Sequence, residues 1–439
     1  MANSRAEFAN VSDYIFEEIN FISERLPEPI NIAPIVTDLE IFENLDLPYL
    51  TGKLVISDNS NLYQNFDILG AEKIQVIFRT LSPGSGKLNK TFYISSIDGN
   101  VKDTDHTDVL YFRLVEDIWY SSNLQNVNKF YSGTGASIIE KICKEFLAKE
   151  IGFIGKDLKN FNVIIPNLDP IKAVSWIINR ISTTEGYPFY LFSTLYGEKL
   201  AMADLGSLLA LTPVNEQPYK GYTTSSDAIG VSERVLKQFT FEKSEELHSI
   251  IDRGLIGSQY QYIDTLSNNK NKFAFDIVKD VLKPLIESGI LGDQDNVGYS
   301  PDYKLNDKPF NEIKNRTISR IGGSNAYRTD SRFDVSFDEN KLISDYKRNI
   351  KSLAMIEFLN KAPLTFTVNG LDFASAQSHY TIGNNINIHF LNSLVDNTNN
   401  RIDTKRSGNY LIYSARHIFK KEKYDLIMTG LKIANPERI

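Results

Sequence analysis

Stretches in which apolar and polar residues alternate dominate residues 30–120 of the chain. This period-two pattern is typical of half-buried β-strands, and clusters of turn-forming residues separate the stretches. We therefore predict a small antiparallel barrel or sandwich over residues 30–120. The preceding residues 1–29 are largely polar with scattered aromatic side chains, and we interpret them as an N-terminal arm.

The same β pattern returns, in reduced form, near the end of the chain. The first copy contains a glycine turn and three strands, at 69–70, 74–78, 92–97 and 110–115. The second copy has the same order, at 382–383, 386–390, 410–415 and 426–431. In each copy a strand follows the glycine turn and a hairpin completes the unit. Two similar β-modules in one chain suggest pseudo-symmetry, and pseudo-symmetry favours assembly.

Helical spacing interrupts the β pattern in the middle of the chain. Apolar residues three and four positions apart predict an amphipathic helix over residues 137–149. A second helix is predicted to follow Asp169-Pro170, a good N-cap and first-turn pair. Strands at 187–192 and 200–203 then read as a hairpin, so residues 121–234 are predicted to form an α/β insertion domain.

The second β-module is predicted to be discontinuous. Strand periodicity returns near residue 235, and the stretch 257–264 echoes residues 52–58 of the first module. The echo then stops, and residues 266–361 are predicted to be an insertion with helices and loops. The second module is therefore expected to comprise residues 235–265 plus 362–435. The predicted fold class is α+β and β-rich, with two similar antiparallel β-barrel-like domains and α/β insertions.

Composition narrows the classes of function. The chain has 439 residues, a formal net charge of −7 and one cysteine. A single cysteine excludes an internal disulfide framework and a cysteine-rich metal site. Because Cys143 lies within an apolar helical pattern, we interpret it as a core residue. The acidic balance argues against tight, sequence-independent binding of nucleic acid, which needs clustered Lys and Arg.

Membrane and secretion signals are not expected. No apolar run approaches the roughly 20 residues needed to cross a bilayer. The first 25 residues lack the apolar core of a secretory signal. We therefore expect no membrane anchor and synthesis in a cytoplasm.

Motifs for catalysis and for cofactors are weak. The five histidines show no zinc-type spacing, and the nucleophile-elbow pattern G-x-S-x-G is absent. The stretch 82–87 resembles a phosphate-binding loop only superficially, and the acidic stretch 103–108 reads as a hairpin turn. We predict no catalytic residue, no cofactor and no metal. A carboxylate pair that meets only in the folded chain is left open.

The most distinctive polar spot is Arg416-His417, which precedes a charged turn at 420–423. Two interpretations stay open: a solvated hairpin end, or a contact surface for a neighbouring subunit. His389 lies on another predicted strand of the same module and is interpreted as packed or interfacial. We take Arg416, His417 and His389 as candidate subunit-interface residues.

The run 407–419, closed by Tyr424 and Leu431-Lys432, resembles the end of baseplate hub proteins of contractile-tailed bacteriophages. In that family a G-x-Y-L-I strand leads to an R-H-x-F ending and a returning strand. The regions 165–190 and 257–276 resemble the same family, which is related to the hub part of type VI secretion spike proteins. The resemblance covers most of the chain from about residue 30. The first 25 residues and the loop 292–309 have no counterpart.

This resemblance implies a non-enzymatic structural protein with two tube domains per chain. Three chains would form a homotrimeric ring of six similar β-modules that adapts a threefold spike to the sixfold tail tube. The implied partners are the spike protein, the tail tube-initiating proteins and the tape measure protein. Phage DNA would pass through the lumen without specific binding. The implied location is the virion tail baseplate, after synthesis in the host bacterial cytoplasm.

Three alternatives remain at this point. One is the hub segment of a type VI secretion spike, against which we note that no spike-like β-helical repeat follows Ile433. Another is a tail-associated cell-wall hydrolase, which would need a catalytic domain for which no motif is seen. The last is a carbohydrate-binding or receptor-binding tail protein, which would not predict the same module twice.

Overall fold

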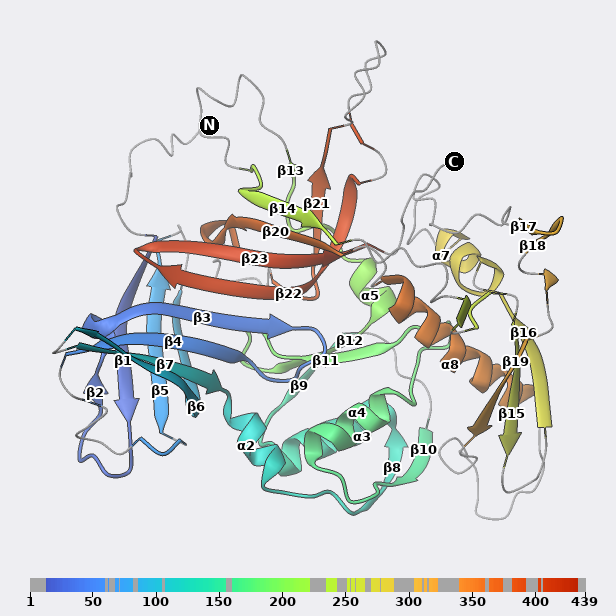
Figure 1. Ribbon diagram of the computed structural model, residues 1–439. Helices are drawn as coiled ribbons and strands as arrows, with labels where there is room; N and C mark the ends of the chain where they lie inside the picture. Colours follow the sequence, from blue (N-terminus) through green and yellow to red (C-terminus); the bar gives the residue numbers. More distant parts are fainter. Residues whose placement is uncertain are drawn as a thin grey trace, which may run out of the picture.

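One largely antiparallel sheet of 13 strands runs through both β-modules (Figure 1). The computed structural model describes residues 13–59, 62, 68–70, 72–81, 86–104, 107–154, 160–221, 234–242, 251–252, 254–256, 258–264, 270–276, 278–287, 304–309, 312–313, 316–322, 339–359, 363–373, 381–391, 402–403 and 406–432. The centres of the two turns discussed above, at 82–85 and 105–106, lie outside these residues. So do His106, His248 and His379.

The first β-module supplies seven strands of this sheet. In spatial order they are β3 (Val36–Asn44), β4 (Thr51–Asp58), β7 (Thr107–Val115), β6 (Lys87–Thr104), β5 (Lys73–Thr80), β1 (Tyr14–Ile22) and β2 (Ile30–Asn31). The alternation in the sequence explains the packing, because Leu39 and Ile41 of β3 and Leu54 and Ile56 of β4 are completely buried. Their polar neighbours point to the other face.

Part of the segment predicted as an N-terminal arm, residues 1–29, belongs to the sheet. Residues 14–22 form strand β1, which pairs antiparallel with β5. Ile19 and Phe21 of this strand are completely buried in the core of the first module. The alternation Ile19, Phe21 was present in the sequence, but its acidic neighbours obscured it.

The second β-module has the same strand order as the first. Its strands are β14 (Gln238–Phe241), β20 (Leu364–Asn369), β23 (Lys423–Leu431), β22 (Gly408–Lys420) and β21 (Asn385–His389). They correspond in turn to β3, β4, β7, β6 and β5. A short strand β13 (Tyr219–Lys220) pairs with β21.

The repeat extends to the register of the strands. Ile94 lies opposite Leu114 in the first module, and Ile412 lies opposite Gly430 in the second. In both modules a β-bulge follows this pair and the register resumes two residues later at a serine. The two copies of the sequence repeat therefore share both strand order and register at these residue pairs.

The two modules are not two separate closed barrels. Strand β22 pairs with β3, so the hydrogen-bonded sheet is continuous from one module into the other. Within the first module, β3 and β1 are not paired with each other in the described chain. Pairing β22 with β3 removes an exposed strand edge inside the chain, which is a physical reason for a shared sheet.

The stretch 257–264 does not belong to the second β-module. It forms β15 (Ser258–Asp264), which pairs with β16 (Lys270–Phe275) and β19 (Arg316–Gly322) in a separate three-stranded sheet. The counterpart of β4 is β20, which follows β15 by about a hundred residues in the sequence. Strand periodicity identified a strand at 257–264 correctly, but alternation alone does not say in which sheet a strand lies.

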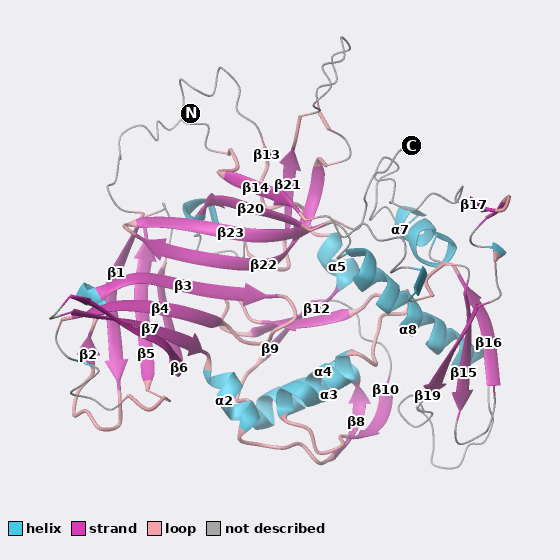
Figure 2. Cartoon of the chain, viewed as in Figure 1, coloured by secondary structure: helices cyan, strands magenta, loops and turns pink. Residues whose placement is uncertain are grey.

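The insertions carry most of the helices (Figure 2). The first insertion contains α2 (Asp117–Asn123), β8 (Phe130–Thr134), α3 (Gly135–Phe146), β9 (Ile151–Ile154), β10 (Asn160–Ile164), α4 (Pro170–Ile178), β11 (Phe189–Phe192), β12 (Leu200–Asp204) and α5 (Leu205–Leu209). Asp169 caps α4 as predicted, because its side chain accepts a hydrogen bond from the Lys172 backbone N–H. Strands β11 and β12 form the predicted antiparallel pair. Cys143 is buried in the core of this insertion.

The second insertion contains η3 (Val278–Leu282), α7 (Lys283–Glu287), β17 (Lys304–Leu305), β18 (Lys308–Pro309) and α8 (Glu339–Leu359), besides the three-stranded sheet. Short 3-10 turns η2 (Ala33–Ile35) and η6 (Gly370–Phe373) precede β3 and follow β20. Helix α8 buries Ile350 and Met355 in the same apolar core as the second β-module. This insertion is therefore packed onto the sheet.

Candidate assembly site at the seam between the modules

Strand β22 joins the two modules because its two halves have different partners. Its first half, Gly408–Leu411, pairs with β21 of its own module. Its second half, from Ser414 to Lys420, pairs with β3 of the first module, from Asn44 to Asp38. We call this second pairing the seam. Two of the three candidate interface residues, Arg416 and His417, lie on it.

Arg416 lies on the outer face of the seam. Its guanidinium makes a two-point contact with Glu40 of β3, with Nη2–Oε1 at 2.7 Å and Nε–Oε2 at 3.2 Å. Lys420 and Asp38 form a parallel ion pair at 2.5 Å. The Arg416 side chain is 44% exposed, so its contribution to the free energy of unfolding is expected to be small.

His417 lies on the inner face and is completely buried. Its Nδ1 is 2.6 Å from the hydroxyl of Tyr424, and its Nε2 is 3.1 Å from Glu43 Oε2. The second contact is close but poorly aligned for a hydrogen bond, and neither atom has another partner in the described chain. In the single chain this side chain is fully enclosed, between strands of the two modules. The contact that His417 makes with Glu43 is therefore between the two modules of one chain.

Glu43 connects the buried His417 to the first insertion. Its Oε1 accepts hydrogen bonds from the backbone N–H of Leu195 and from the hydroxyl of Thr381, the latter at 3.3 Å. Leu195 belongs to the β11–β12 loop and is buried in the core of the first β-module. The sequence contained a signal for Glu43, since it occupies the inward position that follows Leu39 and Ile41, where an apolar residue is expected.

Two largely buried charged side chains, Lys90 and Glu116, also contact the β11–β12 loop or lie beside it. Lys90 of β6 donates to the carbonyl of Gly197 at 2.8 Å and lies 4.0 Å from Glu116. Burial raises the pKa of Glu116, and the nearby ammonium group opposes that shift. Burial lowers the pKa of Lys90, and Glu116 opposes that shift in turn. Burial and the neighbouring Tyr196 hold the pKa of Tyr424 well above its usual value, so its hydroxyl remains a neutral hydrogen-bonding group.

His389 is not part of the seam. It ends β21, which pairs with the other half of β22, and its carbonyl accepts a hydrogen bond from the Gly221 N–H at 2.8 Å. Its backbone pairs with Lys220 of β13. The structure therefore separates His389 from the Arg416-His417 pair.

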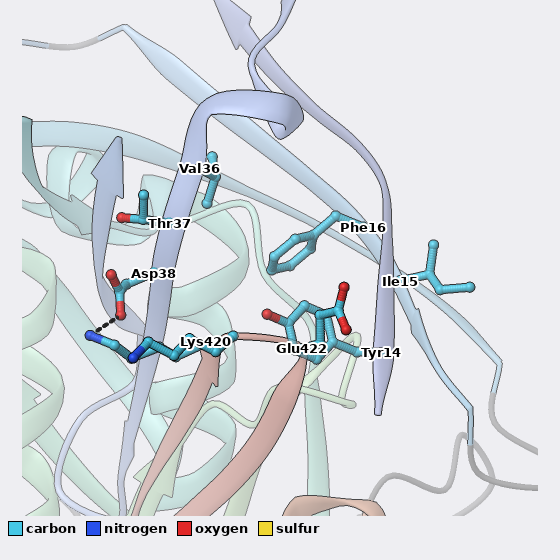
Figure 3. Close-up of a pocket in the computed structure, with 9 residues that line it drawn as sticks. Tyr14, Ile15, Phe16, Val36, Thr37, Asp38, Lys420 and Glu422 are labelled. Atoms are coloured by element: carbon cyan, nitrogen blue, oxygen red, sulfur yellow. Dashed lines mark ion pairs between the residues drawn. The ribbon is translucent and has the colours of Figure 1, made fainter. Parts of the chain in front are cut away.

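A groove opens at the end of the seam, between β1 and β3 (Figure 3). It has a volume of about 660 Å³ and is lined by Tyr14, Ile15, Phe16, Val36, Thr37, Asp38, Lys420, Lys421 and Glu422. The β22–β23 turn borders it, and the carbonyl of Glu422 accepts a hydrogen bond from the Asp13 N–H at 2.7 Å. The Asp38 and Lys420 charges, which both line the groove, pair with each other.

Two kinds of reactive site, a metal centre and an activated cysteine, can be judged from the described residues. Among them no group of three or more His, Cys, Asp or Glu side chains is placed to hold a metal ion. Burial raises the pKa of the Cys143 thiol to about 12, so the thiolate needed for nucleophilic chemistry is scarce. In the same part of the chain, no helix has the length and apolar character needed to cross a bilayer.

Comparison with known proteins gives a likeness of fold and none of sequence. No protein-family profile matches the chain, and no curated protein matches it either. Among solved structures, the tail protein from Neisseria meningitidis MC58 superposes with a TM-score of 0.53 at 12% identity, covering 97% of this chain and 98% of that one. The 43 kDa tail protein of prophage MuSo2 from Shewanella oneidensis has a TM-score of 0.49 at 10% identity, with coverages of 95% and 98%. The E. coli c3393 protein, a component of the type VI secretion system, has a TM-score of 0.43 at 11% identity, with coverages of 96% and 79%.

The likeness to the Neisseria tail protein extends over nearly the whole of both chains. At this identity it establishes a shared fold and nothing finer. The chain therefore shares the fold of that protein, which is β-rich and multi-domain, with a large antiparallel sheet.

Proposed function

We propose that the chain is a structural hub of a phage tail baseplate, and that three copies form a ring which adapts a threefold spike to the sixfold tail tube. The observation that carries this proposal is the internal repeat. Two modules with the same strand order and the same bulge lie side by side in one sheet. Three such chains would present six similar units, which is what a junction between threefold and sixfold objects requires.

The seam explains how neighbouring modules would join. Inside the chain one module continues into the next through β22 and β3, with hydrogen bonds along both strands. The fold shared with a tail protein agrees with this role. The proposed partners are the spike, the tube-initiating proteins and the tape measure protein, and the proposed location is the tail of the virion.

A conduit for DNA should not bind its cargo. The net charge of −7 is compatible with this, because affinity for the phosphate backbone depends on clustered Lys and Arg. We therefore propose that DNA passes through the ring without specific contacts.

The proposal is tested by assembly of the full chain. The chain is fused at its C terminus, through a flexible linker, to a trimeric coiled coil that replaces the spike and raises the effective concentration of the modules. Light scattering is expected to give three times the 49.8 kDa chain mass plus the fused segments. Electron-microscopy class averages are expected to contain a closed ring with six similar lobes.

A matched fusion to a dimeric coiled coil serves as the control and should not close a ring. Three separate bodies tethered to the trimeric coiled coil would contradict the hub. The hydrolase alternative predicts such separate bodies together with release of products from cell-wall glycan. The carbohydrate-binding alternative predicts separate bodies together with binding to glycan, without release of products.

A further inference from the structure

Among the residues that the structure describes, one half of strand β6 lacks the pairing partner that the equivalent half of β22 has. Strands β6 and β22 are equivalent, and each pairs by its first half with β5 or β21. The second half of β22 pairs with β3 on the same side. In the described chain the equivalent half of β6, Ser96–Lys102, pairs with β7 on one side only. Its other edge is open.

Strand β14 has the complementary open edge. It is the equivalent of β3 in the second module, and in the described chain it pairs only with β20. Its Phe239 is 38% exposed and packs against Phe390 at a ring distance of 5.0 Å. Leu391 and Ile402, which face each other in a β-bridge beside Phe390, are 40% and 38% exposed. An open strand edge flanked by exposed apolar side chains is typical of a surface that pairs with another chain.

The exposed side chain of Leu69 also indicates a contact with a second chain. Leu69 and Ile382 precede equivalent glycines, Gly70 and Gly383, which share a left-handed backbone with φ of 94° and 81°. Ile382 is 1% exposed and belongs to the same apolar core as Leu45, the residue that follows β3. Leu69 is 74% exposed. Such an exposed apolar side chain would be stabilised by burial against a second chain.

We propose that the open half of β6 in one chain pairs antiparallel with β14 of a second copy, forming between chains the seam that β22 and β3 form within one. This inference rests on the proposed hub ring and identifies its contact. Such a head-to-tail contact closes into a ring when the rotation between copies permits.

The internal seam defines the register of the contact. Ile418 pairs with Glu40 in the seam. Through the pairing with β7 and β23, Val101 is the equivalent of Ile418, since Val101 lies opposite Val109 and Ile418 opposite Asp425. The equivalent of Glu40 in the second module is Thr240. Glu40 pairs with Lys53 of β4, and Thr240 pairs with Thr365, which has the equivalent position in β20. The expected pair between chains is therefore Val101 with Thr240.

The contact between chains would be weaker than the seam within the chain. Asn100 takes the position of His417 and Gly99 that of Arg416, while Thr240 replaces Glu40. The contact then has neither the buried histidine nor the two-point ion pair. A ring of this kind would come apart into folded chains before the chains themselves unfold.

Cysteine cross-linking tests the register. The variant carrying Val101→Cys and Thr240→Cys is mildly oxidised as the trimeric coiled-coil fusion and run on a non-reducing gel. A covalent trimer is expected as the main product, because directly paired cysteines satisfy the distance limit of a disulfide. The matched control, Val101→Cys with Gln238→Cys, is two residues out of register and should give little product. Cys143 does not interfere because it is buried.

A second variant measures the apolar contribution without cross-linking. Leu69→Ser leaves the fold unchanged, because the side chain is exposed in the single chain. In the coiled-coil fusion it should lower the equilibrium constant for ring closure by about tenfold or more for each contact. Equal assembly of this variant and the wild type would argue against the contact.

The outcomes separate this inference from the proposed function. A closed six-lobed ring in which Val101→Cys and Thr240→Cys fail to cross-link overturns the β6–β14 contact and leaves the hub standing. Cross-linked products that grow beyond the trimer without closing would support the contact and overturn the ring. Separate chains without cross-links overturn both.

Discussion

At the scale of single residues, Arg416 and His417 show how neighbours on one strand differ in role. Both were predicted from the sequence as a distinctive pair. The strand alternation turns Arg416 to the outer face and His417 to the core. The histidine then meets Glu43, which no local pattern connects with it, because the two residues lie in different modules.

Replacing His417 with Ala should destabilise the chain by about 3–5 kcal/mol, because it leaves the buried Glu43 carboxylate without its neighbour. Arg416→Ala, the matched control on the outer face, should cost roughly 0–1 kcal/mol. The measurement is the midpoint of urea unfolding at unchanged slope. The double variant with Glu43→Ala should cost less than the sum of the single changes. Equal losses of stability for His417→Ala and Arg416→Ala would contradict the buried contact between His417 and Glu43.

At the scale of elements, the glycine turns before β5 and β21 repeat the same backbone in different surroundings. Gly70 and Gly383 both have a left-handed backbone. A Cβ atom at position 70 would meet only the Ile94 carbonyl oxygen, at 3.6 Å. A Cβ atom at position 383 would lie 2.8 Å from the ring of Phe192. The difference arises because the first insertion covers the second turn.

Both alanine substitutions should therefore be unfavourable, but to different extents. Gly70→Ala should cost about 1–2 kcal/mol for the left-handed backbone. Gly383→Ala should cost a further 1–3 kcal/mol or so from overpacking. Thermal or urea unfolding of both variants checks this order. Adding Phe192→Leu should recover part of the loss at position 383 and none at position 70. A larger loss for Gly70→Ala would show that the two turns are not packed as described.

At the scale of the whole molecule, the seam is one closed joint between the modules, and the two edges equivalent to it have no partner in the described chain. The closed joint is the seam, whose hairpin end places Phe419 and Tyr424 in the core of the first module. These two edges belong to β14 and to the second half of β6. Stability should accordingly be uneven along the sheet.

Amide hydrogen exchange should reveal this difference. In the unassembled chain, peptides covering 238–241 and 96–102 should exchange at least about tenfold faster than peptides covering 36–44 and 414–420, since open edges need little local unfolding. In the coiled-coil-fused trimer both open edges should become protected together. Protection of only one of them, or of neither, would be inconsistent with a ring closed through these edges.

The sequence alone determined the repeat, the strands at 386–390 and 410–415 and the capped helix after Asp169. These depend on local period and capping, which are properties of neighbouring residues. Local alternation could not decide that β22 joins β3, that β15 leaves the sheet or that residues 14–22 complete it, because strand pairing depends on residues far apart in the chain. The buried contact between His417 and Glu43 was hidden for the same reason: it exists only once the tertiary structure brings the two modules together.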